Sequence, residues 1–367
     1  MGAWQSYSLR LQRKRWRIRA MRKSRELRAA ADRTDQIRPG DLLLFSTLRN
    51  EHVRLPYFLR YYRDLGINHF LMVDNDSTDG SDAFLADQPD VSLWRTGGSY
   101  KRSRFGVDWL NWLARKHAHG HWALTVDPDE FFLFPFCDTR PLRALTDWLD
   151  ASSIRSFSAM LLDMYPKGPI NAQPYLPGDN PLDIACWFDS GNYAIRRNHR
   201  FGNLWIQGGP RARMFFADRP ERAPALNKVP LVRWDRRYAY VSSTHMLLPR
   251  GLNAVFDEWG GEKASGLLLH TKFLDTFTGK AEEELSRKQH YAGSTEYLAY
   301  AARLRDAGHR VDGGDRAERL LQVEPRDADP YKMRVTFVIS GEVEPGHRIR
   351  LETTFGSQEK TAVRPTA

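Results

Sequence analysis

The feature that most constrains this chain is one apolar stretch that runs directly into acidic residues. Residues 121–135 read HWALTVDPDEFFLFP, so a short apolar run precedes Asp127, Asp129 and Glu130. A run of this length beside a Pro-containing turn is typical of a central β-strand. Buried carboxylates must be paired or must bind a metal. We therefore expect these acids at the carboxyl edge of a sheet, where α/β proteins bind their ligands.

The two aspartates of this stretch favour a metal site. Pro128 restricts the backbone between Asp127 and Asp129. Two hard oxygen donors at this edge suit Mg²⁺ or Mn²⁺, and these ions in turn suit a diphosphate. A turn rich in capping acids is the alternative, because the tripeptide alone is common. Its surroundings have to decide between the two interpretations.

Length and composition indicate a folded, cytoplasmic protein. The chain has 367 residues, of which 41% are hydrophobic, enough for one large or two modest domains. No apolar run approaches the roughly 18–20 residues of a transmembrane helix, and the N-terminus lacks the apolar segment of a secretory signal. Cys137 and Cys186 show neither metal-ligand spacing nor a disulfide framework, which favours a reducing compartment.

The net charge of +10 comes almost entirely from one segment. Residues 10–28 contain ten Arg or Lys and one acid, Glu26, whereas the remainder is close to neutral. On a helix predicted over residues 7–33, these charges indicate a peripheral contact with the anionic inner face of a membrane. A solvated helix is the alternative. Nucleic acid is disfavoured, because no basic face studded with aromatic residues follows.

From residue 41 onward, strands and helices alternate. Strands are predicted at 42–48, 70–73, 91–94 and 123–126, with helices at 53–65, 77–86 and 107–117. This alternation indicates an α/β fold with a mostly parallel sheet and helices on both faces. The strand ends then open on one edge. That arrangement brings together three polar clusters, residues 47–51, 74–79 and 127–130.

Beyond residue 135 the alternation is weaker. A helix is predicted at 143–151, strands at 157–162, 241–248 and 266–270, a loop at 166–185, a charged helix at 278–305 and a β-hairpin at 331–355. Arg211 and neighbouring arginines flank a Gly-Gly turn and could hold phosphates, with solvated arginines as the alternative. We divide the chain into a basic helical segment (1–36), a main domain (37–310) and a small C-terminal β addition (311–367).

Four pieces of this sequence resemble glycosyltransferases of the GT-A fold, in particular the family 2-like group. The pieces are TLRNE at 47–51, VDNDSTDG at 73–80, VDPDEFFLFP at 126–135 and LLHTKF at 268–273. The resemblance implies a Rossmann-like nucleotide-diphospho-sugar transferase fold. It also implies a metal-dependent hexosyltransferase that moves a sugar from a nucleotide-sugar donor, with a UDP-sugar expected. The acceptor would be a glycan or a lipid-linked molecule in cell-surface polysaccharide synthesis.

The resemblance also assigns roles to individual residues. Those that would bind the nucleotide sugar are Thr47, Arg49, Asn50, Glu51, Asp74, Asp76, Asp127, Lys272 and Arg211. Those that would hold Mn²⁺ or Mg²⁺ are Asp127, Asp129 and His270. A histidine ligand favours Mn²⁺, and His245 competes with His270 for that place. A purely structural histidine is the alternative.

The base of the reaction is the least defined part of this expected site. Inversion needs a carboxylate that takes the proton of the acceptor hydroxyl. The acidic pair that the family places after the DxD motif is missing here, which is a departure. Asp163 and Asp189 are the catalytic candidates, and Asp163 comes first because it ends a strand.

Two other functions stay open. A strand that ends in Asp74 and continues through Asp76 to Thr78 also matches the nucleophile motif of haloacid dehalogenase-like phosphatases. That motif is expected on the first core strand, whereas here it follows the second. The other alternative is a non-catalytic adaptor that binds a membrane or nucleic acid through residues 10–28. Intact acids at Asp127 and Asp129 argue against it.

Overall fold

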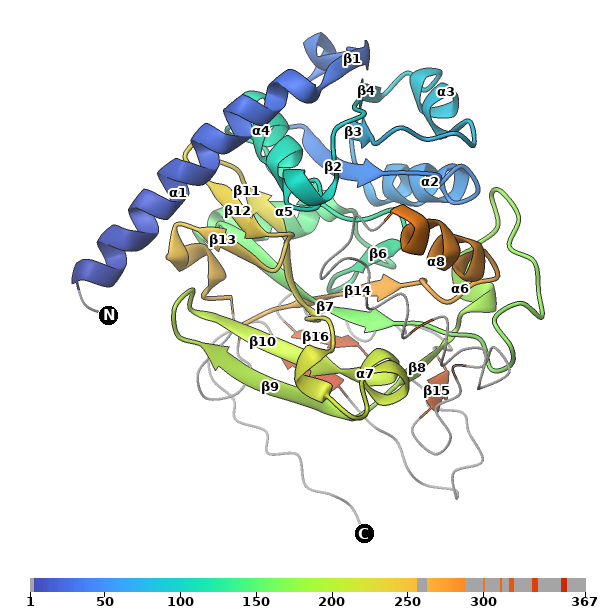
Figure 1. Cartoon of the computed structure of the whole chain (residues 1–367). Coiled ribbons are helices and arrows are strands. Elements are labelled where there is room, and N and C mark those ends of the chain that lie inside the picture. Colours follow the sequence, from blue (N-terminus) through green and yellow to red (C-terminus); the bar gives the residue numbers. More distant parts are fainter. Residues whose placement is uncertain are drawn as a thin grey trace.

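A nine-stranded sheet forms the centre of the described chain (Figure 1). The computed structural model describes residues 3–255 and 263–287, residues 300 and 311, and the short ranges 317–319, 332–335 and 351–354. The strand order is β1-β4-β3-β2-β5-β11-β7-β14-β6. In that order the strands span Arg28–Ala31, Val91–Arg95, His69–Asp74, Leu42–Leu48, Trp122–Thr125, Asn227–Arg233, Ser156–Asp163, Gly266–His270 and Glu130–Leu133.

The half of this sheet from β4 to β5 is parallel, as predicted. In the β2–β3 pair, Leu48 lies beside Asp74, and in the β2–β5 pair Phe45 lies beside Thr125. In the other half, β11 is antiparallel to β5 and β7, β14 is parallel to β7, and β6 is antiparallel to β14. The predicted α/β class is confirmed. The carboxyl ends of β2, β3, β5, β7 and β14 therefore meet the amino ends of β11 and β6 at one edge.

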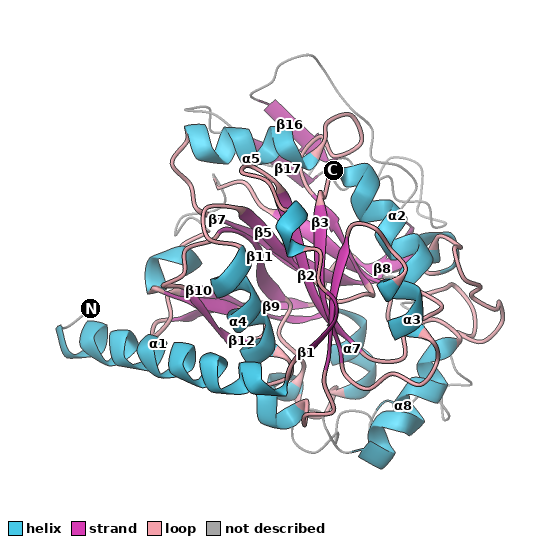
Figure 2. Cartoon of the chain, turned by 90° about the horizontal axis from the view of Figure 1, so that it is seen from above, coloured by secondary structure: helices cyan, strands magenta, loops and turns pink. Residues whose placement is uncertain are grey.

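Helices cover both faces of the sheet (Figure 2). They are α1 Ala3–Lys23, α2 Leu55–Leu65, α3 Ser81–Ala86, α4 Val107–His117, α5 Leu142–Ala151, α6 Pro181–Ile184, α7 Gly209–Phe215 and α8 Thr276–Arg287. Leu42 and Leu44 of β2 pack with α2 and α5, whereas Leu43 and Phe45 pack with α4. Successive side chains of a strand alternate between faces, so a strand covered on both faces is apolar throughout.

Smaller strand pairs surround the central sheet. They are β9 Tyr193–Asn198 with β10 Asn203–Gly208, β12 Ala239–Ser242 with β13 Met246–Leu248, β8 Trp187–Asp189 with β15 Ala317–Arg319, and β16 Lys332–Val335 with β17 Leu351–Thr354. The last pair confirms the predicted C-terminal hairpin. The single strand predicted at 241–248 is wrong, because β12 and β13 form an antiparallel pair with a turn between them.

The basic N-terminal segment differs most from its prediction. The helix predicted over residues 7–33 ends at Lys23 as α1, and Arg28–Ala31 form β1 at the edge of the central sheet, antiparallel to β4. Arg33 fixes this connection by donating to the carbonyl oxygens of Val91 at 2.9 Å and Ala86 at 2.8 Å. Long-range pairing thus decides the structure of this alanine-rich stretch, because strand propensity depends on context.

Two predicted helices also change. α3 begins at Ser81 rather than at residue 77, because Asp74 and Asp79 accept backbone N–H groups from the intervening turn, at 3.1 Å from Ser77 and 3.0 Å from Ser81. The helix predicted over 278–305 appears as α8 up to Arg287. Residues 288–299 and 301–305 of that prediction lie outside the described residues.

Tyr62 of α2 connects this helix to the strand that carries Glu130. Its buried hydroxyl donates to the Glu130 carbonyl oxygen at 2.7 Å and accepts from the Phe132 N–H at 3.1 Å. Because β6 begins at Glu130, these two bonds hold the start of β6 at the carboxyl edge.

We predict that Tyr62→Phe destabilises the fold through these two bonds. The change leaves one buried carbonyl and one buried N–H without their partner, at a cost of about 1–3 kcal/mol. Urea unfolding should show this loss. Tyr57→Phe, at a half-buried position on the same helix, should change the free energy of unfolding by no more than about 0.5 kcal/mol. Equal effects of the two substitutions would contradict the prediction.

His117 at the end of α4 gives the fold a sensitivity to acid. Its half-buried ring packs against Trp94, with ring centroids 5.8 Å apart. Burial lowers the pKa of His117 to about 4, and Lys116 adds to the effect. The unfolded chain binds this proton near pH 6.5. Below that pH the unfolded state therefore holds more protons than the folded state. The free energy of unfolding decreases as the pH is lowered.

We predict that His117→Gln flattens the acid dependence of stability. From pH 6.5 down to about 4, the free energy of unfolding of the wild type should fall more steeply than that of the variant. Urea unfolding at stepped pH values measures both slopes. His119→Gln, at an exposed position two residues away, is the control. Parallel slopes for H117Q and the wild type would refute the assignment.

Candidate functional site

A pocket of about 310 Å³ opens at the carboxyl edge of the sheet. It brings together most of the residues that the sequence singled out. Those that line it are Thr47, Arg49, Glu51, Asp127, Asp129, Glu130, Arg211, His245, His270 and Lys272. These residues come from distant parts of the chain. The predicted convergence of strand ends therefore forms one site.

Five predicted residues are placed outside the lining of this pocket. Asp74 and Asp76 border a separate cavity of about 780 Å³ beside Arg95, next to β1. Asn50 contacts α8, as described below. Asp163 and Asp189 are buried and do not line the pocket, and their contacts are described below.

A chain of alternating charges crosses the floor of the pocket. His270, at the end of β14, has its Nε2 3.1 Å from Asp129 Oδ2 and its Nδ1 2.6 Å from Asp163 Oδ1. Burial lowers the pKa of His270, but Asp129 and Asp163 outweigh it and raise the pKa above its ordinary value. Burial raises the pKa of Asp129, but His270 outweighs it and holds the pKa well below the usual range. The three side chains therefore stabilise one another as ions.

Arg211 extends this chain from α7. Its Nε donates to Asp163 Oδ2 at 2.7 Å, and both side chains are almost fully buried. Burial raises the pKa of Asp163, but Arg211 and His270 together outweigh it and lower the pKa below its usual value. Asp163 thus holds two cationic partners that face the pocket, His270 and Arg211. This arrangement makes it a positioning residue behind the pocket wall.

Lys228 is a cation at the site that the sequence did not predict. It lies on β11, is buried, and its Nζ contacts Glu130 and lies 3.3 Å from Asp127 Oδ2. Burial lowers the pKa of Lys228, but Glu130 and Asp127 outweigh it and raise the pKa above its ordinary value. A lysine within the apolar run of β11 is the signal that could have identified it.

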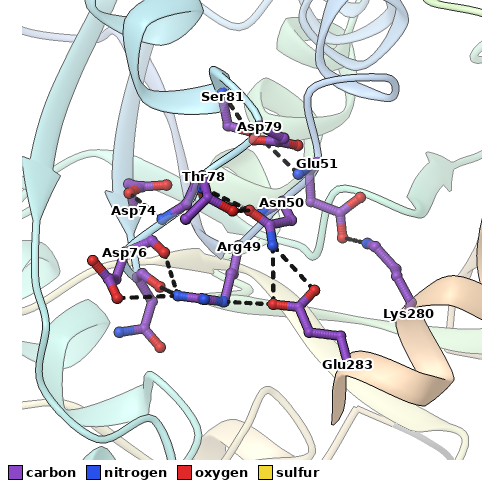
Figure 3. A network of polar contacts seen from close by, with 12 residues as sticks. Arg49, Asn50, Glu51, Asp74, Asp76, Thr78, Asp79, Ser81, Lys280 and Glu283 are labelled. Carbon is purple, nitrogen blue, oxygen red and sulfur yellow. Dashed lines mark hydrogen bonds and ion pairs between the residues drawn. The ribbon is translucent and has the colours of Figure 1, made fainter. Parts of the chain in front are cut away.

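Helix α8 contributes Lys280, Glu283 and Arg287 to the lining of the pocket. Lys280 contacts Glu51 Oε1 (Figure 3). Arg54 Nε lies 3.2 Å from Glu51 Oε2. Burial raises the pKa of Glu51, and Lys280 and Arg54 oppose the rise. Arg54 also donates to the Thr271 carbonyl oxygen at 3.0 Å. These contacts join α8, α2 and the segment after β14.

Glu283 makes a second contact between α8 and the end of β2. Its carboxylate accepts from Arg49 Nε at 2.9 Å and from Asn50 Nδ2 at 2.9 Å (Figure 3). Arg49 also donates to the Asn75 carbonyl oxygen at 2.8 Å, and Asn50 Oδ1 accepts from the Thr78 N–H at 2.8 Å. The TLRNE stretch therefore joins the loop after β3 to α8. Lys280, Glu283 and Arg287 share one helix face, a spacing that could have marked them.

The charges that line the pocket favour an anionic ligand. The cations are Arg49, Arg54, Arg211, Lys228, Lys272, Lys280 and Arg287, and the acids are Glu51, Asp127, Asp129, Glu130 and Glu283. Seven cations thus face five acids, before either histidine is counted. Arginine and lysine side chains that converge in a pocket suit phosphate oxygens. The chemistry agrees with a diphosphate.

Asp189 belongs to a different network. It is fully buried, its Oδ1 accepts from the Tyr165 hydroxyl at 2.7 Å, and its Oδ2 accepts from Arg213 Nε at 3.0 Å. Its backbone carbonyl accepts from the Tyr193 hydroxyl at 2.7 Å. These contacts connect β8, β9 and α7, which is a structural arrangement.

The acids of the pocket fit a metal that arrives together with a diphosphate. Asp127 is about half exposed at 49%, and both it and Asp129 line the pocket. Within the described residues, no three His, Cys, Asp or Glu side chains converge as a complete ligand set. Mg²⁺, however, usually takes one or two carboxylates and completes its shell with phosphate oxygens and water. Two carboxylates are therefore enough.

The two candidate histidines differ in their hydrogen bonds. Both nitrogens of His270 face carboxylates. His245 Nδ1 donates to the Asn227 carbonyl oxygen at 2.7 Å, which leaves its Nε2 as the ring acceptor. Burial lowers the pKa of His245 to about 4 and keeps it neutral. A metal-ligating histidine commonly donates its other N–H in this way, so His245 keeps its place as an alternative to His270.

Comparison with known proteins adds little to this geometry. No protein-family model and no curated protein matches the sequence. Among solved structures, the chain is similar to a 4-diphosphocytidyl-2C-methyl-D-erythritol synthase, with 12% sequence identity, 79% of this chain and 96% of that chain covered, and a TM-score of 0.24. A similarity of this size carries no argument about binding or activity. The function has to be argued from the pocket.

We predict that Asp163→Asn strongly destabilises the protein. The change leaves Arg211 and His270 in a buried position without the carboxylate that they share, and breaking a buried pair in this way costs about 3–5 kcal/mol. Urea unfolding near neutral pH measures the loss. Asp138→Asn, at an exposed site, is the matched control. A loss below about 1 kcal/mol would show that the charge chain is not structural.

Proposed function

We propose that this chain is a glycosyltransferase that binds a nucleotide-sugar donor in the pocket at the carboxyl edge of the sheet. One observation carries the proposal: Asp127 and Asp129 line one pocket of about 310 Å³ together with seven lysines and arginines. Carboxylates that can hold a metal, together with cations that can hold phosphates, are what a sugar diphosphate requires. Each of the four sequence pieces that resemble GT-A enzymes contributes to the lining of this pocket, VDNDSTDG through Asn75.

The chain's own residues account for the donor's binding and for the departure of its diphosphate. Transfer breaks the bond between the anomeric carbon and the diphosphate, and negative charge grows on the departing phosphate. Lys272, Lys280 and Arg287 line the pocket, and their positive charge would stabilise that growing negative charge. Because hydrogen bonds and ion pairs already hold Arg49 and Lys280, little reorganisation is needed when the charge develops.

Mn²⁺ or Mg²⁺ would be held by Asp127 and Asp129. His270, the predicted third ligand, would first have to give up the proton between its Nε2 and Asp129, and the neutral His245 is the alternative. When bound, such an ion supplies a Lewis acid that stabilises the diphosphate leaving group. Thr47 and Glu51, which line the pocket, would contact the nucleotide. Arg211 would act on the same side as His270, because both contact Asp163.

The acceptor in this proposal is a glycan or a lipid-linked molecule. The phosphatase interpretation gains no specific observation. Asp74, the nucleophile in the phosphatase interpretation, is buried, and its Oδ2 accepts from the Ser77 N–H at 3.1 Å.

We predict metal-dependent release of a nucleoside diphosphate from one sugar nucleotide in a panel. Asp129→Asn removes one charge from the site and should reduce release by at least about 100-fold, and a chelator should abolish release from the wild type. Asp138→Asn, exposed and distant from the pocket, should retain full activity. Coupled detection of the released diphosphate provides the rate.

Thermal unfolding provides the second readout, because a transferase can be inactive without its acceptor. A donor that binds the folded state alone raises the melting temperature. The proposal requires at least one sugar nucleotide to do so for the wild type, and less for D129N. It is wrong if no sugar nucleotide is turned over and none raises the melting temperature in the presence of Mn²⁺ or Mg²⁺.

A further inference from the structure

Helix α1 differs from an ordinary surface helix in the placement of its apolar side chains. It lies along one flank of the molecule against α4 and β12, and its first turns extend away from the sheet (Figures 1 and 2). A surface helix normally turns its apolar side chains toward the core and its polar ones toward water. In α1, large apolar side chains lie on the solvent side.

The inner face of α1 is fixed to the fold. Leu9 and Ala20 are buried, and the Trp16 ring lies under the Arg104 guanidinium, 4.1 Å from its carbon. Arg19 Nε donates to the buried carboxylate of Asp108 on α4 at 2.7 Å. These contacts hold α1 against the fold in one orientation, so that its outer face is defined.

That outer face carries a stripe of exposed apolar side chains. The stripe consists of Trp4 (84% exposed), Tyr7 (53%), Leu11 (48%), Ile18 (41%) and Met21 (46%). At about 100° per residue, the five side chains project within an arc of roughly 100°, opposite to Leu9 and Ala20. The stripe runs over almost the entire helix and is interrupted once, between Leu11 and Ile18, where the exposed Lys14 projects within the same arc. The long side chain of such a lysine can cover apolar surface while its ammonium group reaches the headgroup level.

Cations accompany the stripe along its length. Arg10, Lys14, Arg15 and Arg22 are exposed: Arg10 and Arg15 flank the stripe on opposite sides, Arg22 lies at its edge, and Lys14 lies within it. The sequence of α1 contains no Asp or Glu. The exposed face thus combines an apolar stripe with positive charge that no acid of the same helix offsets.

We propose that this stripe docks the protein on an anionic lipid bilayer, with α1 lying in the plane of the interface. A bilayer surface accepts both components at once, because apolar side chains enter the acyl boundary while cations stay at the anionic headgroups. The contact is peripheral, since none of the helices in the described part of the chain has the length and apolar character to cross a membrane.

Two other occupants of this face fit it less well. A second copy of the chain would bring two sets of cations together without any acid of α1 between them, and like charges across an interface are unfavourable. Nucleic acid would match the cations, but its phosphates offer nothing to the aliphatic side chains of Leu11, Ile18 and Met21. An anionic bilayer is the occupant that suits both the apolar stripe and the cations. This docking does not depend on the proposed glycosyl transfer.

Flotation of the full chain with vesicles tests the proposal. One set of vesicles contains phosphatidylcholine alone and the other phosphatidylcholine with phosphatidylserine. The stripe variant is W4S/Y7S/L11S, which keeps every cation, and the charge variant is R10Q/K14Q/R15Q/R22Q, which keeps the stripe. Ile195→Ser and R196Q/R222Q, which alter exposed residues away from α1, are the matched controls. Melting temperatures verify that all variants fold.

The wild type should float with the anionic vesicles and much less with phosphatidylcholine alone. The stripe variant should bind more than about tenfold more weakly, and each cation removed should weaken binding by about fivefold. Both controls should bind as the wild type. Three results would overturn the proposal: no flotation of the wild type, undiminished flotation of the stripe variant, or binding to duplex or single-stranded nucleic acid in place of vesicles. Self-association that W4S/Y7S/L11S abolishes, without vesicle binding, would assign the face to a second copy instead.

Discussion

Charge that is buried at strand ends is the constraint on which this structure depends. Parallel pairing of β2, β3 and β5 and of β7 and β14 brings polar side chains to one edge, where several of the charged ones are buried. Each buried charge there needs an opposite partner. The sequence of contacts from Asp129 through His270 and Asp163 to Arg211 meets this need. Since the same contacts hold the pocket floor, stability and the geometry of the site have a common origin.

Local pattern was enough to predict the strands and their polar ends. Leu42–Leu48 and Gly266–His270 are apolar runs of strand length that stop at polar residues, and both have the predicted bounds. From the parallel arrangement it then follows that Arg49, Asp127 and His270 lie near one another, and the structure confirms this. Each strand can be recognised from a short apolar run in the sequence. The order of these runs and helices along the chain then indicates the parallel arrangement.

The remaining parts depend on contacts between distant residues. Lys280 contacts Glu51, which lies 229 positions earlier in the sequence. The strand β1 pairs with β4, so Arg28 lies beside Arg95. A window of local sequence holds no information on such pairs. Lys228 was missed because a single lysine in an apolar strand signals a buried ion pair only when its partners, Asp127 and Glu130, are known. Asp189 shows the reverse case, an acid with a plausible sequence position whose partners are structural.

Both proposed surfaces are places where the usual pattern of apolar inside and polar outside fails. At the carboxyl edge of the sheet, charged side chains are buried, and on α1 apolar side chains are exposed. Such local violations are expected at functional sites and are compensated elsewhere in the fold. Here the compensation is visible: ion pairs offset the buried charges, and Leu9, Ala20 and the Arg19–Asp108 pair hold α1 in place.

A crystal structure grown with a nucleoside diphosphate and Mn²⁺ would test the central claim most directly. The nucleoside diphosphate would be the one whose sugar nucleotide raises the melting temperature most. The predicted result is a diphosphate between Asp127 and Asp129 on one side and Lys272 and Lys280 on the other, with the nucleoside toward Thr47 and Glu51. A diphosphate bound instead in the separate cavity beside Asp74 and Arg95, or a pocket that stays without nucleotide at saturating concentration, would contradict the assignment.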